Sequence, residues 1–365
     1  MTVNRSLATA GLTASLFGLA ACSAGPSTTN SGSGPLLTTQ NLSGVPSADR
    51  LVFSRIQNPT TTPVPNAVHD TATLRIHNSG TAPLNITGLS VTGPWQISQA
   101  AAPATVAAGS SLDVQLKFVA TAPTTGLGSL VVTSDDPSRP TLTVQLAGLW
   151  QSYSERDPSG SPTEPSLLQI LQAFGYQVNL GGDPSSQHGQ RKAQGDEVLS
   201  AYWQAADPSQ SVQIDELASN EVLGTETTLA WYTPNSTNMN SLFTHAGTDS
   251  QSVLPRLKGA TTPATASFTP SGAFGLQVSN TTIGTEYSDP NLNNGSYDEK
   301  MGCPVGMCGQ HMRFWPVHNQ DGSLVANTYV IAVDYYNTKT SSDTKSNYDF
   351  QDDVFLIRNV TPATP

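Results

Sequence analysis

The sequence predicts a mainly β protein in which a leader and a flexible segment precede two β domains. Short runs that alternate apolar and polar residues recur from about residue 51 onward, and this period of two is typical of strands with one buried face. Charged residues form only 12% of the chain, which is about half the usual share, and Thr, Ser, Asn, Gln and Gly replace them. Helical periodicity is confined to one short segment, 165–175.

Residues 1–21 have the composition of a signal peptide. Arg5 precedes an uncharged, largely apolar run that is too short to predict a membrane-spanning helix. The run ends in LAAC at 19–22, which resembles the bacterial lipobox, whose cysteine receives the lipid before cleavage. The resemblance implies a lipoprotein acylated on Cys22, anchored in the cell envelope and facing outward, and in the outer membrane if the host has one. An ordinary secretory peptide with an incidental Cys22 is the alternative.

The net charge argues against one class of partner. The chain carries a formal charge of -11 at pH 7. Such a surface would repel nucleic-acid phosphates. Cations and neutral glycans remain compatible with it.

The first predicted domain occupies residues 48–149, after a tether at 22–47. The tether lacks periodicity and is rich in Ser, Thr, Gly and Pro, so it cannot bury enough apolar surface to order itself. About six or seven short strands with turn signals follow, as in an immunoglobulin-like sandwich. The NSGT turn at 78–81 and the SDDP corner at 134–137 make this region similar to β-sandwiches of the ASPM/SPD-2/Hydin type, found in bacterial surface proteins. This resemblance implies a fold and no chemistry.

The second predicted domain, 164–365, follows a polar linker at 150–163. It opens with the helical segment, in which Pro165 stands at a first-turn position and Gly175 ends the apolar pattern. A helix of this length is marginal alone, so we expect it to pack on a sheet. The remainder reads as irregular β structure with long loops, a larger and jelly-roll-like β-sandwich.

Cys303 and Cys308 are the cysteines left once Cys22 is assigned to lipid. Export places them in oxidising surroundings, and the PVGM segment between them can turn tightly enough for a bridge. We therefore predict a disulfide that shapes a local loop. The alternative is a soft-metal site in which both cysteines join His311 and a further methionine or histidine, although the C-x4-C-x2-H spacing is not a common zinc framework.

An acidic stretch near the C-terminus predicts a calcium site. Asn347, Asp349, Asp352 and Asp353 precede an apolar strand, and oxygen ligands at this spacing suit Ca²⁺. The stretch NYDFQDDV is similar to a D-x-D-F-N-D-L-V signature of secreted bacterial β domains often linked to calcium, and the match is partial because Asn347 replaces the first Asp and Gln351 the usual Asn. Turn capping is the alternative, and strand alternation places Asp352 and Asp353 on opposite faces. The oxygen-rich loop 286–293 is a weaker candidate.

Aromatic residues of the second domain are candidates for a flat surface on which a glycan could stack. They are Trp203, Trp231, Trp315 and Tyr335. The alternative is that they belong to the core, and alternation requires that only one of Trp231 and Tyr232 faces inward.

Catalytic motifs give little support for an enzyme. The sequence contains no G-x-S-x-G elbow, H-E-x-x-H run or P-loop. We therefore expect an envelope-anchored, non-catalytic binding or adhesion module for a glycan or another envelope component, stabilised by calcium, with recognition on the loops of 177–310. A glycan-processing hydrolase and a purely structural spacer are the alternatives. A hydrolase requires two carboxylates about 5 to 9.5 Å apart in a cleft.

Overall fold

The computed structural model describes residues 34–58, 69–123, 126–336 and 347–364. The predicted signal peptide, Cys22 and the first part of the predicted tether lie outside the described residues. Strands dominate the regular structure, so the mainly β class is confirmed. The described helices are all too short or too polar to cross a membrane.

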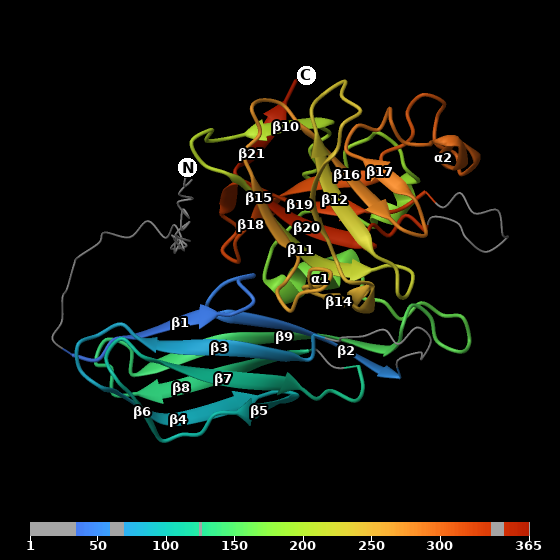
Figure 1. Cartoon of the computed structure of the whole chain (residues 1–365). Helices are drawn as coiled ribbons and strands as arrows, with labels where there is room; N and C mark the ends of the chain where they lie inside the picture. The colour runs from blue at the N-terminus through green and yellow to red at the C-terminus, as the bar shows by residue number, and fades with distance from the viewer. Residues whose placement is uncertain (1–33, 59–68, 124–125, 337–346, 365) are drawn as a thin grey trace, which may run out of the picture. The chain divides into compact units, whose positions relative to one another are not determined.

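The first sandwich consists of two facing sheets (Figure 1). One has the strand order β1-β3-β7-β5 and the other β2-β9-β8-β4-β6. β2 and β9 pair in parallel, although they are far apart in the sequence. The strands are β1 (Leu37–Asn41), β2 (Arg50–Asn58), β3 (Thr71–Asn78), β4 (Leu84–Thr92), β5 (Trp95–Gln99), β6 (Ala104–Val106), β7 (Ser111–Phe118), β8 (Leu127–Ser134) and β9 (Thr141–Tyr153).

Alternation builds the interior of the first sandwich. In β3 every second residue is buried, and Leu74 and Ile76 are fully covered. The predicted NSGT turn is held by Asn78, whose Nδ2 donates to the carbonyls of Ala82 (2.8 Å) and Val106 (2.9 Å). A buried amide that caps a turn in this way satisfies backbone groups that the strands leave unpaired.

Residues 37–47 belong to this sandwich, so the tether prediction for 22–47 is wrong over this part. β1 pairs with β3, and Leu37 and Val45 are buried. Asp136, in the SDDP corner, accepts a hydrogen bond from the backbone N of Leu37 at 2.7 Å. Composition misleads here because a Ser/Thr-rich edge strand needs few apolar residues once a neighbouring strand supplies its hydrogen bonds.

The predicted linker 150–163 is largely part of the fold. β9 continues to Tyr153, and Thr163 donates its hydroxyl to the Tyr153 carbonyl at 2.7 Å, which closes the intervening residues into a loop. Turn-forming residues such as Asp157 therefore mark a local turn here and do not mark a free connection between domains.

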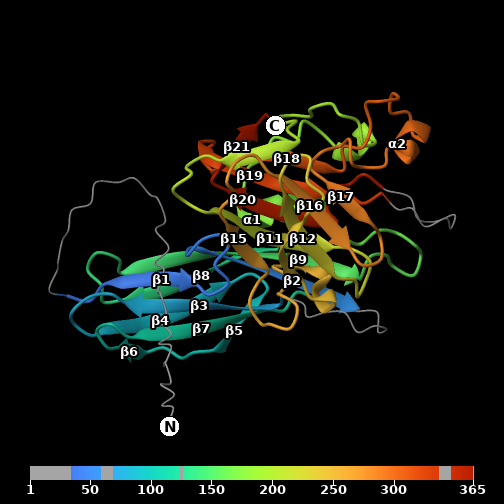
Figure 2. The ribbon, with the colours of Figure 1, turned by 45° about the horizontal axis from the view of Figure 1, so that its top comes forward.

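The second sandwich packs a six-stranded sheet against a four-stranded one (Figure 2). The larger sheet has the order β14-β11-β20-β19-β18, with β15 also paired to β11, and the smaller one has the order β13-β12-β16-β17. β10 and β21 form a separate pair. The strands are β10 (Tyr202–Ala205), β11 (Val212–Asn220), β12 (Thr227–Tyr232), β13 (Asn240–Thr244), β14 (Gln251–Val253), β15 (Thr265–Phe268), β16 (Gly275–Asn280), β17 (Thr285–Tyr287), β18 (Met312–His318), β19 (Leu324–Val333), β20 (Asp353–Arg358) and β21 (Val360–Ala363).

The predicted helix is confirmed as α1 (Leu167–Phe174). Ser166 is its N-cap and forms a capping box with Gln169, and Gly175 closes it with a positive φ of 79°. Pro165 therefore lies just outside the helix and does not occupy its first turn. A second short helix, α2 (Ser296–Lys300), lies in a loop where the sequence gives no helical pattern.

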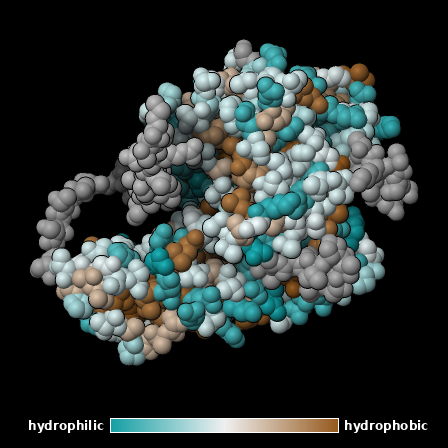
Figure 3. Space-filling model, in the orientation of Figure 1, coloured by the Kyte–Doolittle hydropathy of each residue, from teal (hydrophilic) through white to brown (hydrophobic). Residues whose placement is uncertain are grey.

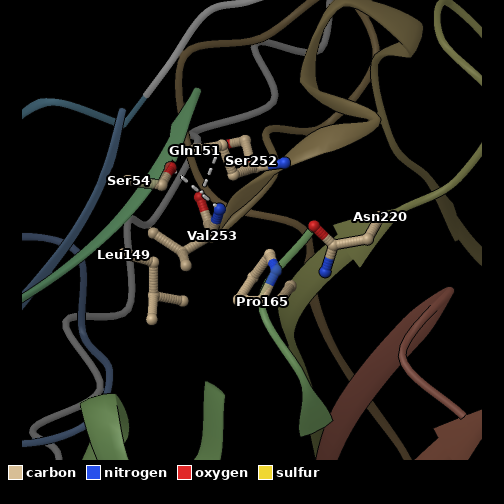
Figure 4. A pocket seen from close by; sticks show the side chains of 8 residues that line it. Ser54, Leu149, Gln151, Pro165, Asn220, Ser252 and Val253 are labelled. Atoms are coloured by element: carbon tan, nitrogen blue, oxygen red, sulfur yellow. Dashed lines mark hydrogen bonds between the residues drawn. The ribbon is translucent and has the colours of Figure 1, made fainter. Parts of the chain in front are cut away.

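The two sandwiches share one hydrophobic cluster. It joins α1 and the outer face of the six-stranded sheet to Val45, Val52 and Ala147 of the first sandwich. Polar contacts cross the same seam: Ser54 Oγ accepts from the backbone N of Val253 at 3.1 Å. Figure 4 shows the side chains around this point, and the hollow that they line is too tight for a water molecule.

Candidate functional site

Buried and half-buried ionisable side chains form three groups in the described part of the second sandwich, and Asp349 and Asp352 are the half-buried ones. We name the groups as follows. The core-end cluster comprises Glu216, Glu221, His245, Tyr335 and Asp353; the acidic loop cluster comprises Asp334, Asp349 and Asp352; and the His311 clamp comprises Glu286, Asp298 and His311.

The core-end cluster lies where the interior between the two sheets ends. Glu216 follows the inward alternation of Val212 and Ile214 in β11 and stands at a β-bulge. Asp353 is the first residue of β20 and shares the inward face of Phe355, and His245 directly follows β13. All members of the cluster are at most 2% exposed.

Contacts within the core-end cluster join both sheets. His245 Nδ1 lies 2.7 Å from Glu216 Oε1, and its Nε2 lies 3.7 Å from Glu221 Oε2. The Tyr335 hydroxyl donates to Asp353 Oδ2 at 2.6 Å. Glu221 also accepts hydrogen bonds from Thr227 at the start of β12 and from Asn280 at the end of β16. It accepts a third from Thr225, in the loop before β12.

The electrostatics of this cluster follow from its burial. Burial raises the pKa of Glu216 to about 8, although His245 opposes this shift. Burial and the neighbouring Asp353 raise the pKa of Glu221 well above its ordinary value. Burial alone would lower the pKa of His245, but the charge and hydrogen bond of Glu216, together with the charge of Asp353, outweigh it and raise this pKa to about 9. Glu216, His245 and Asp353 each offer a possible metal ligand, with ligand atoms within 4.8 Å of one another.

Sequence reasoning missed most of this cluster. Only Asp353 and Tyr335 were candidates; Asp353 was assigned to the calcium loop and Tyr335 to the stacking surface. A signal was present in β11, because Glu216 continues the run in which Val212 and Ile214 alternate toward the interior. A charged residue at an inward position of a strand requires a buried partner. The partner His245 could not be identified, since it lies in a different sheet.

The acidic loop cluster contains part of the predicted calcium site. Burial and the charge of Asp334 raise the pKa of Asp349 to about 7 and that of Asp352 well above its ordinary value. Asn347 is exposed and donates to Asp349 Oδ2 at 2.6 Å. Asp353 faces the interior and does not join this group. The predicted calcium site is therefore corrected: Asp334 takes the place of Asp353 beside Asn347, Asp349 and Asp352. β20 begins at Asp353, so Asp352 lies just before the strand, and the prediction of opposite faces from strand alternation stays a prediction.

Asp334 was not found from the sequence because it follows β19, well before the acidic stretch. Its proximity depends on the pairing of β19 with β20, in which Val333 lies opposite Asp353. The side chain of Asp334 accepts from the backbone N of Phe350 at 3.4 Å, and Asp352 accepts from the backbone N of Tyr335 at 3.0 Å. The pairing of β19 with β20 thus brings Asp334, which follows β19, close to the loop that precedes β20.

The His311 clamp lies beside the disulfide loop. Cys303 and Cys308 form the predicted bridge, with a Cα separation of 5.9 Å. His311 Nδ1 lies 2.7 Å from Glu286 Oε2, and its Nε2 lies 3.0 Å from Asp298 Oδ2. Since both ring nitrogens pair with carboxylates and both sulfurs are bonded to each other, the alternative soft-metal site is wrong.

The clamp also explains the weaker calcium candidate at 286–293. Glu286 pairs with His311, and Asp289 accepts from the Tyr202 hydroxyl at 2.7 Å and from the backbone N of Asn291 at 2.9 Å. These oxygens therefore fix the loop through protein hydrogen bonds. Burial alone would lower the pKa of His311, but Glu286 and Asp298 outweigh it and raise this pKa to about 10.

The predicted stacking surface is wrong for most of its residues. Trp203 and Trp315 are fully buried and Tyr335 is 2% exposed, because each lies in a hydrophobic cluster or in the core-end cluster. Trp231 is half-buried and stacks on Phe268, with ring centroids 5.5 Å apart. Amphipathic rings that look suited to a ligand in the sequence are used here to fill the interior.

A groove of about 330 Å³ lies at the seam between the sandwiches. We call it the seam groove. Within it, Arg256 forms a bidentate pair with Asp249, with N–O distances of 2.7 and 2.8 Å. Its lining consists of Leu42, Ser43, His69, Thr71, Ala72, Thr73, Gln115, Asp249, Ser252, Leu254, Arg256, Thr261, Thr262 and Pro263.

The walls of the seam groove are polar and nearly neutral. Hydroxyl groups of serine and threonine and the amide of Gln115 form much of the lining, and Asp249 is its only carboxylate among the described residues. Burial lowers the pKa of His69 to about 4, so this imidazole is neutral at pH 7. The face shown in Figure 3 is likewise mostly hydrophilic or intermediate in colour, with small separate hydrophobic patches.

No protein-family model matches the chain, and no curated protein matches it. Solved structures match it only weakly. One is the secreted serine protease VesC from Vibrio cholerae, which is 12% identical over 80% of this chain and 47% of that chain, with a TM-score of 0.21. Another is the YadV chaperone, which is 8% identical over 79% of this chain and 96% of that chain, with a TM-score of 0.23. The E. coli chaperone DraB is similar at 11% identity, over 69% of this chain and 95% of its own, with a TM-score of 0.22.

The chain thus spans about half the length of the protease that it matches. At these TM-scores the similarities carry no argument about function.

Proposed function

We propose that this chain is an envelope-anchored lipoprotein whose two sandwiches bind a neutral glycan in the seam groove without changing it chemically. The observation that carries the proposal is the groove, which is about 330 Å³ in volume and lined by residues of both sandwiches. Ligand sites commonly occur at domain interfaces and place a few polar groups in a concave surface. The LAAC tetrapeptide at 19–22 supports the anchor.

The chemistry of the groove favours a neutral, hydroxyl-rich ligand. Thr71, Thr73 and Gln115 on one wall face Thr261 and Thr262 on the other, and such groups donate and accept hydrogen bonds without adding charge. The only charged pair, Arg256 with Asp249, is already neutralised internally. The negative net charge of the chain disfavours polyanions.

The shared hydrophobic cluster supports a preorganised groove. α1 packs on β2 and β9 of the first sandwich and belongs to the second, so the walls are joined by continuous apolar packing. A preformed site loses less conformational entropy on binding than one that must first assemble. The chain therefore fits a binding module better than a flexible spacer.

Glycan binding tests the proposal directly. We expect the mature chain, purified with Cys22→Ser so that it carries no lipid, to bind neutral envelope polysaccharides in a glycan array and by calorimetry. Thr73→Arg places a large side chain in the groove and should abolish binding. Thr133→Arg adds the same side chain to an exposed position of β8, away from the groove, and should bind like the unaltered chain.

The alternatives give different outcomes in the same experiment. Release of new reducing ends from a bound glycan would show a hydrolase and contradict the non-catalytic proposal; the presence of a single carboxylate in the groove favours binding, because glycosidases use two. Failure to bind any envelope polysaccharide would contradict the proposal and favour the structural spacer.

We also propose that Ca²⁺ binds the acidic loop cluster and stabilises the second sandwich. Burial, and after it the charge of Asp334, raise the pKa values of Asp349 and Asp352, and a divalent cation bound among these oxygens would favour their ionised forms. Calcium should raise the melting temperature because it binds the folded state. Asp352→Asn should remove this response without lowering stability in a chelator, whereas Asp321→Asn, at an exposed turn, should keep it. A calcium response that survives in Asp352→Asn would contradict the assignment.

A further inference from the structure

The core-end cluster combines side chains that a protein interior does not normally bury together. Glu216, Glu221 and Asp353 bring three carboxyl groups out of water. His245 is the only basic side chain that forms an ion pair with them among the described residues. Buried carboxylates are strongly unfavourable unless positive charge lies among them, and one imidazolium can offset only one of them.

Three atoms of this cluster have no hydrogen-bond partner. They are Glu216 Oε2, His245 Nε2 and Asp353 Oδ1, each buried from solvent. Buried polar atoms of native proteins are nearly always hydrogen-bonded. The same three residues are those whose ligand atoms lie within 4.8 Å of one another. Because Glu216 already pairs with Nδ1 on the far side of the imidazole ring, His245 Nε2 and Asp353 Oδ1 are the atoms left to bind a cation.

The distances fit a small tetrahedral ion. His245 Nε2 and Glu221 Oε2 are 3.7 Å apart, which is too long for a hydrogen bond. Two ligands that each lie about 2.1 Å from a tetrahedral zinc ion are about 3.4 Å apart. The separation of these two atoms is therefore close to that of two ligands on a single zinc ion.

Surrounding groups hold the ligands as they do in metal sites. His245 Nδ1 pairs with Glu216 Oε1 at 2.7 Å, which leaves Nε2 directed to the centre of the cluster. The Tyr335 hydroxyl fixes Asp353, and Thr227 and Asn280 fix Glu221. Hydrogen bonds of this kind orient metal-binding histidines and carboxylates.

We propose that Glu221, His245 and Asp353 bind a divalent metal ion of the zinc class inside the second sandwich, with Glu216 orienting the His245 ring through Nδ1. An imidazole nitrogen together with carboxylates suits zinc, whereas calcium takes oxygen ligands. The ion joins the residue after β11 and the first residue of β20, in one sheet, to the residue after β13 of the other, so its role is structural. This site is separate from the acidic loop cluster and does not depend on the proposed glycan.

Metal analysis of the Cys22→Ser chain, exported from cells grown with zinc and purified without chelator, tests the proposal. We expect a single zinc ion per chain and, after exchange with cobalt, visible absorption bands of a mixed nitrogen and oxygen site. Dipicolinate should lower the melting temperature. Asp353→Asn and His245→Gln should lose the metal and the cobalt bands.

Matched variants separate this site from the other clusters. His311→Gln alters another buried histidine between two carboxylates, and Asp352→Asn alters the adjacent acidic loop cluster; both should keep the zinc. Retention of the metal in His245→Gln or Asp353→Asn would overturn the proposal. If these variants fail to fold, the same measurements on the chain without these substitutions test the proposal. Uptake of neither zinc nor cobalt, together with an unchanged melting temperature in dipicolinate, would overturn it.

Discussion

The two sandwiches share a fold class and differ in what fills them. The core of the first is aliphatic and aromatic, and Asp136 is the only charged side chain among its buried described residues. The second buries carboxylates, two histidines and an arginine, in pairs and clusters. Apolar packing depends little on pH or ions, whereas buried charges depend on their partners. The comparison therefore predicts that only the second sandwich responds strongly to charge changes.

The largest expected effect comes from Arg313. Its guanidinium is fully buried, 2.7 Å from Glu197 Oε2, and lies over the ring of Phe350. Arg313→Met leaves Glu197 buried without its partner, so we expect the free energy of unfolding in urea to fall by about 3–5 kcal/mol. The double variant Glu197→Gln with Arg313→Met should recover part of this loss. A decrease in the free energy of unfolding below about 1 kcal/mol would contradict the prediction, because it would be typical of an exposed ion pair on the surface.

The second prediction concerns pH. The pKa of His311 is raised to about 10 in the folded chain, above about 6.5 in the unfolded chain. The stabilisation is therefore fully present below about pH 6.5 and is lost as pH rises through about 10. We expect a loss on the order of 3 kcal/mol or less between pH 7 and 10, measured by urea unfolding at each pH.

His311→Gln tests the origin of this slope. The variant should be less stable at pH 7 and should lose the part of the alkaline slope that His311 contributes. Leu74→Ala, in the core of the first sandwich, is the control: it should cost about 2–5 kcal/mol and keep the slope of the unaltered chain. An unchanged slope in His311→Gln would show that another group titrates.

The smallest expected effect comes from the disulfide. Cys303 and Cys308 are separated by only five positions, and closing so short a loop gains about 2 kcal/mol or less. Replacing both with serine should lower the melting temperature slightly and leave the fold intact. The bridge itself is checked by thiol titration without reductant, which should detect no reactive thiol in the Cys22→Ser chain. Loss of the fold in the double serine variant would contradict a local role.

Local patterns in the sequence were sufficient for the mainly β class, several strands of the first sandwich such as β3 and β7, α1 and the disulfide. Each depends on neighbouring residues: the alternation in β3, the apolar spacing of α1 before Gly175, and the short turn between Cys303 and Cys308. These signals act over a few residues, so they can be read without knowing which strands pair.

Tertiary structure alone decided which distant residues meet. Asp352 and Asp353 are adjacent, yet Asp352 lies near Asp334 in the loop before β20, whereas Asp353 begins β20 and joins Glu216 and His245. The inclusion of β1 in the first sandwich and the seam groove depend in the same way on contacts between remote segments. Hydrogen bonding between strands and burial act through space, and no short stretch of sequence records their partners.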